Sequence, residues 1–321
     1  MRTMQRNRLG NVNAGVSSAA GSPVLAVLQA ESTTEVRAAL LAATLTGMPT
    51  RRLGLKDLEA NGQARATLAA YMGEILPVGT VEFVRAVMGV RGLPEPEPMG
   101  YQSVADYLRR EVREGVLYEL KALKEPIFVK PVATKAFSGF VYDPRRGARA
   151  SGASEYQAEQ LAAIARLKPS TRVWLCDVVE FVCEWRYYVD AAGRILARAR
   201  YDADGSDDAP EPAHEVVLNA ISATVTALEA RGNAHPFALD VGVLADGRTA
   251  VVELTDGWAI GLYGHARTPA GTPWKPQDYI EFLQQRWRSI VAYAELRAAK
   301  EMAQRLDGAT SRGRSRASSL A

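Results

Sequence analysis

The sequence predicts an α+β protein whose strands pair in antiparallel sheets. Two segments rich in apolar and aromatic residues, 172–201 and 237–254, each contain a turn signal near the middle, which is typical of a β-hairpin. Other segments repeat apolar residues at helical spacing, among them 215–228 and 276–291. Hairpins that alternate with helices in this way indicate the α+β class.

Composition narrows the classes of function. A chain of 321 residues, 47% hydrophobic and 23% charged, is long enough for two or three structural units of ordinary globular type. The net charge of +3 gives no reason to expect nucleic acid as a partner. Cys176 and Cys183 are not clustered, so we expect buried thiols in a reducing cytoplasm. No apolar run reaches 18 residues, so no membrane span is expected.

The first third of the chain mixes short elements with flexible segments. Residues 1–22 are rich in Gly, Ser, Asn and Ala, and we expect them to be disordered. A buried strand is expected at 24–28, followed by a helix at 33–45 with Thr33 or Thr34 as its N-cap. Three prolines in 93–100 indicate a linker, and the charged segment 107–118 is interpreted as a helix.

Later segments continue the alternation of strands and helices. A strand is expected at 127–129, ending at Lys130-Pro131, and a helix at 156–167. The acidic segment 202–212 is expected to be a solvated loop. Pro276 suits the first turn of the last helix. The Arg-, Ser- and Gly-containing end, 306–321, is expected to be a disordered basic tail.

The second hairpin places two acidic residues opposite each other. If its loop is the pair Asp246-Gly247, Ala245 pairs with Arg248 and Asp240 lies directly opposite Glu253. Opposed carboxylates repel each other unless a cation lies between them. Because Mg²⁺ takes one or two carboxylates together with phosphate oxygens, the hairpin predicts a metal–nucleotide site.

The first hairpin carries a cationic face. A three-residue loop at 191–193 would place Arg186 opposite Arg198 and Glu184 opposite Arg200, all on one side of the sheet. Guanidinium groups match phosphate oxygens, so this face could bind a phosphate. The alternative is a solvated face on which Glu184 pairs with Arg200.

Two further segments have both a functional and a structural interpretation. Lys130 at a strand end is commonly a solvated terminus, but the small basic turn that follows it, beginning at Lys135, could cover a polyphosphate. The sequence lacks the glycine-rich signatures of a P-loop or a Rossmann fold. Trp258 and Tyr263 either pack in the core or belong to a substrate-side loop.

Taken in order, these pieces resemble the ATP-grasp superfamily, and more closely a subgroup marked by two arginines and one lysine. The stretches that carry the resemblance are Phe128-Val129-Lys130-Pro131, Glu184 to Val189, Ala199-Arg200-Tyr201, Leu239 to Val243, and Val252 to Trp258. The resemblance implies an ATP-grasp fold with two α+β halves enclosing a nucleotide, at 121–305. A smaller N-terminal α/β domain, at 23–120, would precede it.

The resemblance also implies roles for individual residues. Together with Lys135, the positions assigned to ATP are Lys130, Glu180, Phe181, Val182 and Glu184, with 180–182 as the hinge at the adenine. Arg186 and Arg200, with Lys130, would act on the transferred phosphate as catalytic residues. Asp240, Glu253 and Thr255 would form the metal site: the two carboxylates hold Mg²⁺, and Thr255, which stands where the family usually has Asn, can ligate it through its hydroxyl or hold a bound water.

The activity that the resemblance implies is ATP-driven joining of a carboxylate to an amine, or a similar nucleophile, through an acyl-phosphate. The partners would be small-molecule or peptide carboxylates and amines. A nucleotide-binding module without turnover, acting as a sensor or partner protein, is the alternative, and Thr255 favours it. A nucleic-acid role is the weakest hypothesis, because aromatic residues are not interleaved with the basic tail.

Overall fold

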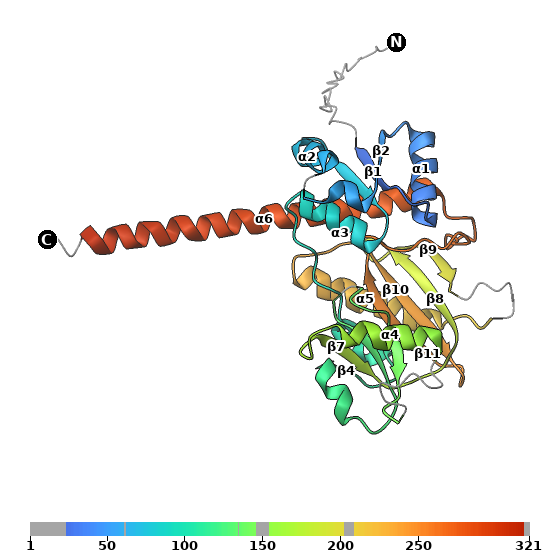
Figure 1. The fold of residues 1–321 in the computed structure, drawn as a ribbon. Coiled ribbons are helices and arrows are strands. Elements are labelled where there is room, and N and C mark those ends of the chain that lie inside the picture. The colour runs from blue at the N-terminus through green and yellow to red at the C-terminus, as the bar shows by residue number, and fades with distance from the viewer. Residues whose placement is uncertain (1–23, 61, 134, 146–153, 202–208, 318–321) are drawn as a thin grey trace, which may run out of the picture.

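The computed structural model describes residues 24–317 apart from 61, 134, 146–153 and 202–208. For Gln63 and for 304–317, only the backbone is described. The predicted disorder of residues 1–22 therefore lies outside the described residues, as does most of the predicted loop at 202–212. The described chain contains three sheets, arranged as a small N-terminal unit above two larger ones (Figure 1).

The N-terminal unit is built on three parallel strands in the order β2-β1-β3. Its main elements are β1 (Leu25–Gln29), α1 (Thr34–Thr46), β2 (Thr50–Leu53), α2 (Gln63–Ala70), β3 (Ile75–Val78) and α3 (Val81–Val90). The Thr33 hydroxyl accepts a hydrogen bond from the Val36 amide at 3.3 Å, which makes Thr33 the N-cap of α1 as predicted. Parallel strands joined by helices agree with the expected α/β unit.

The second sheet is antiparallel and has the strand order β4-β7-β5-β6. Its elements are β4 (Val112–Val116), β5 (Ile127–Pro131), β6 (Phe140–Tyr142), α4 (Glu155–Ala165) and β7 (Arg172–Cys176). Val129, Val173 and Leu175 form its core, against which Leu161 and Ile164 of α4 pack. The predicted strand at 127–129 and the predicted helix at 156–167 are confirmed.

The prediction of a helix at 107–118 is wrong, because strand β4 occupies the middle of that segment, Val112–Val116. Strand β4 pairs with β7 over its full length, from Val112 opposite Cys176 to Val116 opposite Arg172. The β-branched valines of this segment favour a strand once a partner strand is available, and Gly115 disfavours a helix. The charges that suggested a helix instead form ion pairs, such as the one between Glu114 and Arg172. Strand β4 thus lies in the second sheet, although the expected domain boundary at 120 placed it in the N-terminal unit.

The third sheet is also antiparallel, with the order β11-β10-β8-β9. Its elements are β8 (Phe181–Val189), β9 (Ile195–Arg200), α5 (His214–Ala230), β10 (Phe237–Leu244) and β11 (Thr249–Asp256). Helix α5 covers one face, where Val217 and Ile221 share a core with Leu239 and Val241. Both predicted hairpins are confirmed, and with them the α+β class.

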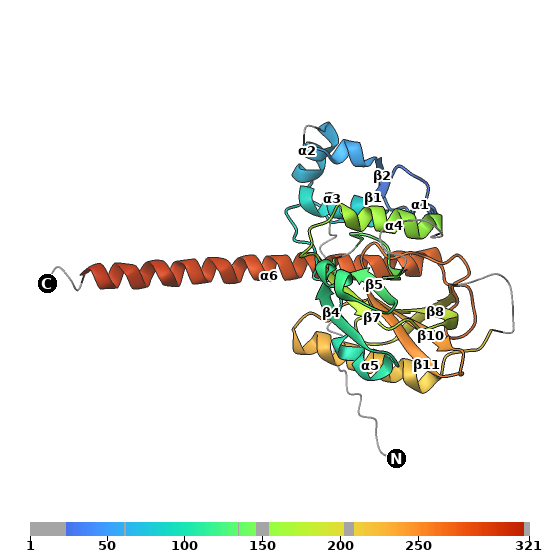
Figure 2. The same cartoon turned by 60° about the horizontal axis from the view of Figure 1, so that its bottom comes forward.

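Helix α6 (Pro276–Ala317) links the N-terminal unit to the third sheet and then extends away from the body (Figures 1 and 2). Its first half is buried at Tyr279, Phe282 and Trp287, in one core with strands of both units. The helical backbone continues through 306–317, so the structure differs from the expected disordered tail there, and 318–321 lie outside the described residues. A packed helix propagates at low cost because each added residue gains a hydrogen bond. Among the described residues, no helix has the length and apolarity needed to cross a membrane.

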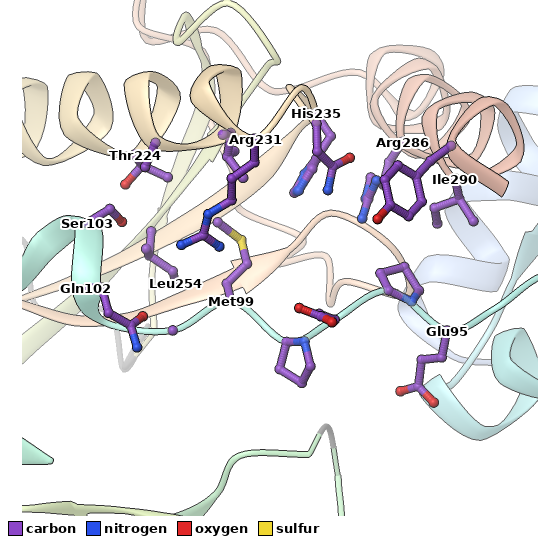
Figure 3. A pocket seen from close by; sticks show the side chains of 18 of the residues that line it. Glu95, Met99, Gln102, Ser103, Thr224, Arg231, His235, Leu254, Arg286 and Ile290 are labelled. Carbon is purple, nitrogen blue, oxygen red and sulfur yellow. The ribbon is translucent and has the colours of Figure 1, made fainter. Parts of the chain in front are cut away.

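A buried ion pair fastens α6 to the end of β11. Arg286, only 2% exposed, donates to both carboxylate oxygens of Asp256 at 2.5 Å. Arg286 and Leu254 form part of the wall of a pocket of about 180 Å³ between the proline-rich linker, α5 and α6 (Figure 3). Leu254 and Met99 separate this pocket from the larger cleft described below.

Replacing Arg286 with methionine should destabilise the protein strongly. Removal of one partner leaves the Asp256 carboxylate buried and uncompensated, which typically costs about 3–5 kcal/mol. Arg288→Met is the matched control: its pair with Glu74 is more than half exposed on the arginine side, so about 1 kcal/mol or less is expected. Urea denaturation measures both values, and equal losses would show that the Arg286–Asp256 pair is not the fastening contact.

Candidate functional site

A cleft of about 840 Å³ lies between the second and third sheets, within the range of ligand-binding sites. Residues from both sheets, from the linker and from the loop after β11 line it. The predicted site residues among them are Lys130, Lys135, Phe181, Glu184, Arg186, Asp240, Glu253 and Thr255. The structure thus brings together eight positions that are spread over more than 120 residues of sequence.

The predicted opposition of Asp240 and Glu253 is confirmed, but it is reached by a different register. The Leu244 amide donates to the carbonyl of Arg248 at 2.9 Å, so the loop has three residues and ends with Gly247 at φ +83°. The predicted pairing of Ala245 with Arg248 is therefore wrong. A longer loop shifts the register by one residue, and a β-bulge at 252 shifts it back.

In the other hairpin the predicted three-residue loop is confirmed, but the predicted facing pairs are wrong. A β-bulge at 196 places Arg186 opposite Ala199 and Trp185 opposite Arg200. Arg198 does not face Arg186. Its guanidinium lies 5.0 Å from the Trp185 ring centroid and pairs with a loop carboxylate instead.

The same bulge explains why Arg200 does not line the cleft. Because side chains alternate along a strand, a shift of one residue moves Arg200 to the opposite face from Arg186. Tyr201 takes the place on the cleft side. Sequence reasoning missed Tyr201, since only the register around the bulge identifies it.

The segment predicted as the adenine hinge, 180–182, lines the cleft only in part. Residues 177–180 connect β7 to β8 and so join the two larger sheets. Residues 177–179 and Phe181 line the cleft, whereas Glu180 and Val182 are not among its lining residues. The Phe181 ring lies against Gly242, where an added Cβ would come within 2.1 Å of the ring. The glycine therefore makes room for the aromatic wall.

A charged row crosses the third sheet at the base of the cleft. Asp240 on the central strand β10 lies between Arg186 on β8 and Glu253 on β11. Arg186 donates to both Asp240 oxygens, at 2.9 and 2.7 Å, and the Tyr201 hydroxyl donates to one of them at 3.0 Å. The Arg186 guanidinium also lies against the rings of Tyr201 and Tyr263, at 5.0 and 5.5 Å from their centres, and the two rings contact each other with their centres 4.9 Å apart.

Burial and the ion pair act against each other at this row. Burial raises the pKa of Asp240 above its ordinary range, although the Arg186 guanidinium opposes that shift. Burial would lower the pKa of Arg186, but the Asp240 carboxylate outweighs it and the pKa is raised well above the ordinary value. Arg186 is therefore a permanent cation at the base of the cleft.

Lys130 brings a second cation from the opposite sheet. It forms an ion pair with Glu253, and its ammonium lies 5.4 Å from the centre of the Tyr101 ring. Burial would raise the pKa of Glu253, but the Lys130 ammonium dominates and holds it below the usual range. The Thr255 hydroxyl lies 3.4 Å from the other Glu253 oxygen. Each of the two opposed carboxylates thus has a protein cation beside it.

The donor set of this site fits Mg²⁺. Asp240 and Glu253 offer carboxylate oxygens on facing strands, and Thr255 adds a hydroxyl. Asp256 is already taken by Arg286. In the part of the chain that the structure describes, no cluster of three or more His, Cys, Asp or Glu side chains could hold a metal. A cation here would therefore need ligand oxygens as well, which is the usual arrangement for Mg²⁺ on a phosphate.

A small turn closes the cleft beside Lys130. The Ser138 amide donates to the buried Gln160 side chain at 2.8 Å, and the Tyr156 hydroxyl donates to the Gly139 carbonyl at 2.7 Å. Both partners belong to α4, so that helix fixes the end of the turn. Lys135 is exposed and has a left-handed backbone with φ +59°, and it remains in the lining of the cleft.

The loop at 257–264 combines the two interpretations drawn from the sequence. Trp258 is buried, and both Trp258 and Tyr263 line the cleft. The Tyr279 hydroxyl donates to the Ile260 carbonyl at 2.7 Å, which anchors the loop to α6. Ala259 has a left-handed backbone conformation with φ +48°. A non-glycine residue in that region is strained, and such strain is often found at binding sites.

Comparison with known families assigns the chain. The ATP-grasp domain of the R2K clade, family 2, matches residues 107–270, and the chain belongs to this family. The predicted superfamily and fold are therefore confirmed. A comparison with curated proteins gave no match.

Several solved structures are distantly similar to this chain. One is D-alanine–D-alanine ligase from Bacillus anthracis, with 13% identity, a TM-score of 0.45, and coverage of 88% of this chain and 100% of that one. Another is the ATP-grasp ligase PsnB with a minimal precursor, at 11% identity and a TM-score of 0.46, covering 82% and 99%. The L-amino acid ligase from Bacillus licheniformis has 13% identity and a TM-score of 0.46, covering 73% and 68%. With TM-scores below 0.5, the family match remains the basis of the assignment.

Replacing Gly242 with alanine should disturb the Phe181 wall. The added Cβ overlaps the ring, and overpacking of this kind costs about 1–3 kcal/mol. Gly89→Ala is the control, because nothing lies within 4 Å of its added Cβ and alanine favours helix α3 by about 1 kcal/mol. Chemical denaturation should give opposite signs, and a neutral Gly242→Ala would contradict the contact.

Proposed function

We propose that the chain is an ATP-dependent ligase that joins a carboxylate to an amine, or a similar nucleophile, through an acyl-phosphate. The observation that carries the proposal is the charged row in the cleft, in which Asp240 and Glu253 face each other with Arg186 and Lys130 beside them. Because the chain belongs to the ATP-grasp family, the nucleotide in this proposal is ATP. The substrates would be small-molecule or peptide carboxylates and amines.

The residues of this chain have distinct roles in the proposal. Asp240, Glu253 and Thr255 would hold Mg²⁺, which when bound would neutralise the charge of the phosphates. Phe181 and the segment 177–179 would form the adenine side of the cleft. Lys130, Lys135 and Arg186 would contact the phosphates, and the turn before β6 would exclude water from them.

The reaction proceeds in two substitutions. A substrate carboxylate oxygen attacks the γ-phosphorus, the bond to the β-phosphate oxygen breaks, and ADP and an acyl-phosphate form. The amine then attacks the carbonyl carbon, phosphate leaves with the bonding electrons, and the amine loses a proton. Arg186, held rigidly by Asp240 and by two aromatic rings, stabilises the negative charge that develops on phosphate oxygens.

Ligand binding in this proposal is an exchange of partners. Without ligand, Lys130 and Arg186 neutralise the carboxylates that would hold the metal. With nucleotide and Mg²⁺ present, Lys130 would turn from Glu253 to the phosphates, and oxygens of Glu253 and Asp240 would hold the metal while Arg186 stays beside Asp240. Since Mg²⁺ alone must displace an existing ion pair, its binding should depend strongly on the nucleotide.

Amine-dependent ADP release is the direct test. A panel of carboxylic and amino acids, each tried with and without amines, should give sustained ADP release over many turnovers only when acid, amine, ATP and Mg²⁺ are all present, because the amine consumes the acyl-phosphate. Glu253→Gln, which keeps the shape and removes the charge, should lower kcat/KM by about 100-fold or more. Nucleotide binding without any turnover would instead favour the sensor or partner module, which Thr255 at the usual Asn position supports.

Lys130→Met should have opposite effects on the metal and on the nucleotide. Loss of the competing ammonium should tighten Mn²⁺ binding without nucleotide by about tenfold, equivalent to about 1.4 kcal/mol. Loss of a charged phosphate contact should weaken nucleotide binding by about 10- to 100-fold. Lys135→Met, which also lines the cleft, should leave binding of Mn²⁺ alone unchanged. Calorimetry measures nucleotide binding, and electron paramagnetic resonance measures Mn²⁺ binding. Weaker Mn²⁺ binding by Lys130→Met would refute the proposed exchange of ion-pair partners.

Both cysteines are buried thiols, as the sequence predicted. The cytoplasmic location drawn from them stays a prediction, and it is compatible with a reaction that consumes ATP.

A further inference from the structure

Arg110 touches three parts of the cleft and was not identified from the sequence. It lies just before β4 and lines the cleft beside the expected adenine hinge. Its guanidinium donates to the carbonyls of Val251 and Val252, at 2.7 and 2.9 Å. The same group lies 5.7 Å from the centre of the Phe181 ring. One side chain therefore joins the edge of the second sheet to the metal strand and to the hinge.

The two carbonyls that Arg110 binds belong to the bulge that sets the register of Glu253. Asp240 pairs with Glu253 and Val241 pairs with Val251, so Val252 is the extra residue of β11. In a regular strand, consecutive carbonyls point to opposite sides, and one guanidinium could not bind both. A bulge turns them to the same side, where the two-pronged donor of arginine fits them.

Without the bulge, the three-residue loop at 245–247 would place Val252 opposite Asp240. Glu253 would then point to the face that α5 covers, because a shift of one residue reverses every side chain. The carboxylate pair thus depends on a local irregularity, and an irregularity of this kind needs a fixed partner for the carbonyls that leave the ladder. Arg110 is that partner.

We propose that Arg110 is a positioning residue, whose guanidinium fixes the β-bulge at Val252 and thereby sets Glu253 opposite Asp240. The backbone before it supports the assignment, since Arg109 adopts a left-handed conformation with φ +54°. A non-glycine residue in that region is strained, and the strain is offset by contacts such as the three hydrogen bonds of Arg110. The metal-related part of the inference rests on the proposed function, whereas the structural part does not.

Arg110→Lys tests the structural part. Lysine keeps the positive charge but cannot bind two carbonyls in a planar fork. Amide hydrogen exchange should rise by about tenfold in the peptide that covers β11, with little change in β8 and β5, because local opening costs less there. Arg113→Lys is the matched control, since Arg113 lies three residues away in an exposed pair with Glu119. Equal exchange in the variant and the wild type overturns the proposal, and so does an increase spread over all three sheets.

Metal dependence tests the consequence for the site. The concentration of Mn²⁺ needed to support nucleotide binding should rise by about 10- to 100-fold in Arg110→Lys, as for other residues that orient a metal ligand. Nucleotide affinity at saturating Mn²⁺ should stay within about threefold of wild type, because bound metal then stabilises the position of Glu253 that Arg110 otherwise fixes. An unchanged Mn²⁺ requirement overturns the positioning role. If the wild type binds no nucleotide, the proposed function fails, and the exchange measurement still decides the role of Arg110.

Discussion

Two carboxylates held opposite each other on a largely buried sheet impose the constraint around which the cleft is built. Asp240 is 1% exposed, and the register gives it Glu253 on one side and Arg186 on the other. Such an arrangement is stable only with compensating positive charge. The third sheet supplies one cation, Arg186, and the second sheet supplies the other, Lys130, so neutrality at the site requires both sheets to be in place. The two carboxylates are therefore neutralised only when the second and third sheets are packed together.

A buried ion pair contributes little net stability, but the loss of one partner is costly. That asymmetry suits a binding site. In the resting cleft Asp240 and Glu253 each have a cation as partner, so the fold tolerates the two carboxylates without ligand. A nucleotide with its metal brings negative phosphates and a positive ion. The phosphates can replace a carboxylate as partner of a protein cation, and the ion can replace that cation beside the carboxylate, so no charge is left uncompensated. Arg186 is held by Asp240, Tyr201 and Tyr263, whereas Lys130 has a flexible stem, and the lysine is accordingly the partner better able to move.

Local turn chemistry predicted the hairpins, and long-range contacts determined what it could not predict. Asp246-Gly247 marked the right place for a turn, but a left-handed Gly247 serves a three-residue loop as well as a two-residue one. The error was cancelled at Val252, where the bulge is held by an arginine 142 residues earlier in the sequence. In the other hairpin the loop length was predicted correctly, so the bulge at 196 was not offset by a second error. The register therefore differs by one residue, and Arg200 lies on the opposite face from the predicted one. Residue types and their order therefore predicted the class of site, while the face of each side chain depended on irregularities that no local pattern encodes.

The N-terminal unit completes the cleft through the loop at 257–264. The Leu262 amide donates to Glu35 of α1 at 2.8 Å, and a Cβ on Gly261 would lie 3.7 Å from both Glu35 and Arg186. The start of the same loop is tied to α6, because Asp256 binds Arg286 and accepts a hydrogen bond from the Trp258 amide. The loop is thus positioned by two other parts of the protein. Its own composition could not distinguish a core segment from a substrate-side segment, since its place beside Arg186 follows from how the N-terminal unit, α6 and the third sheet pack together.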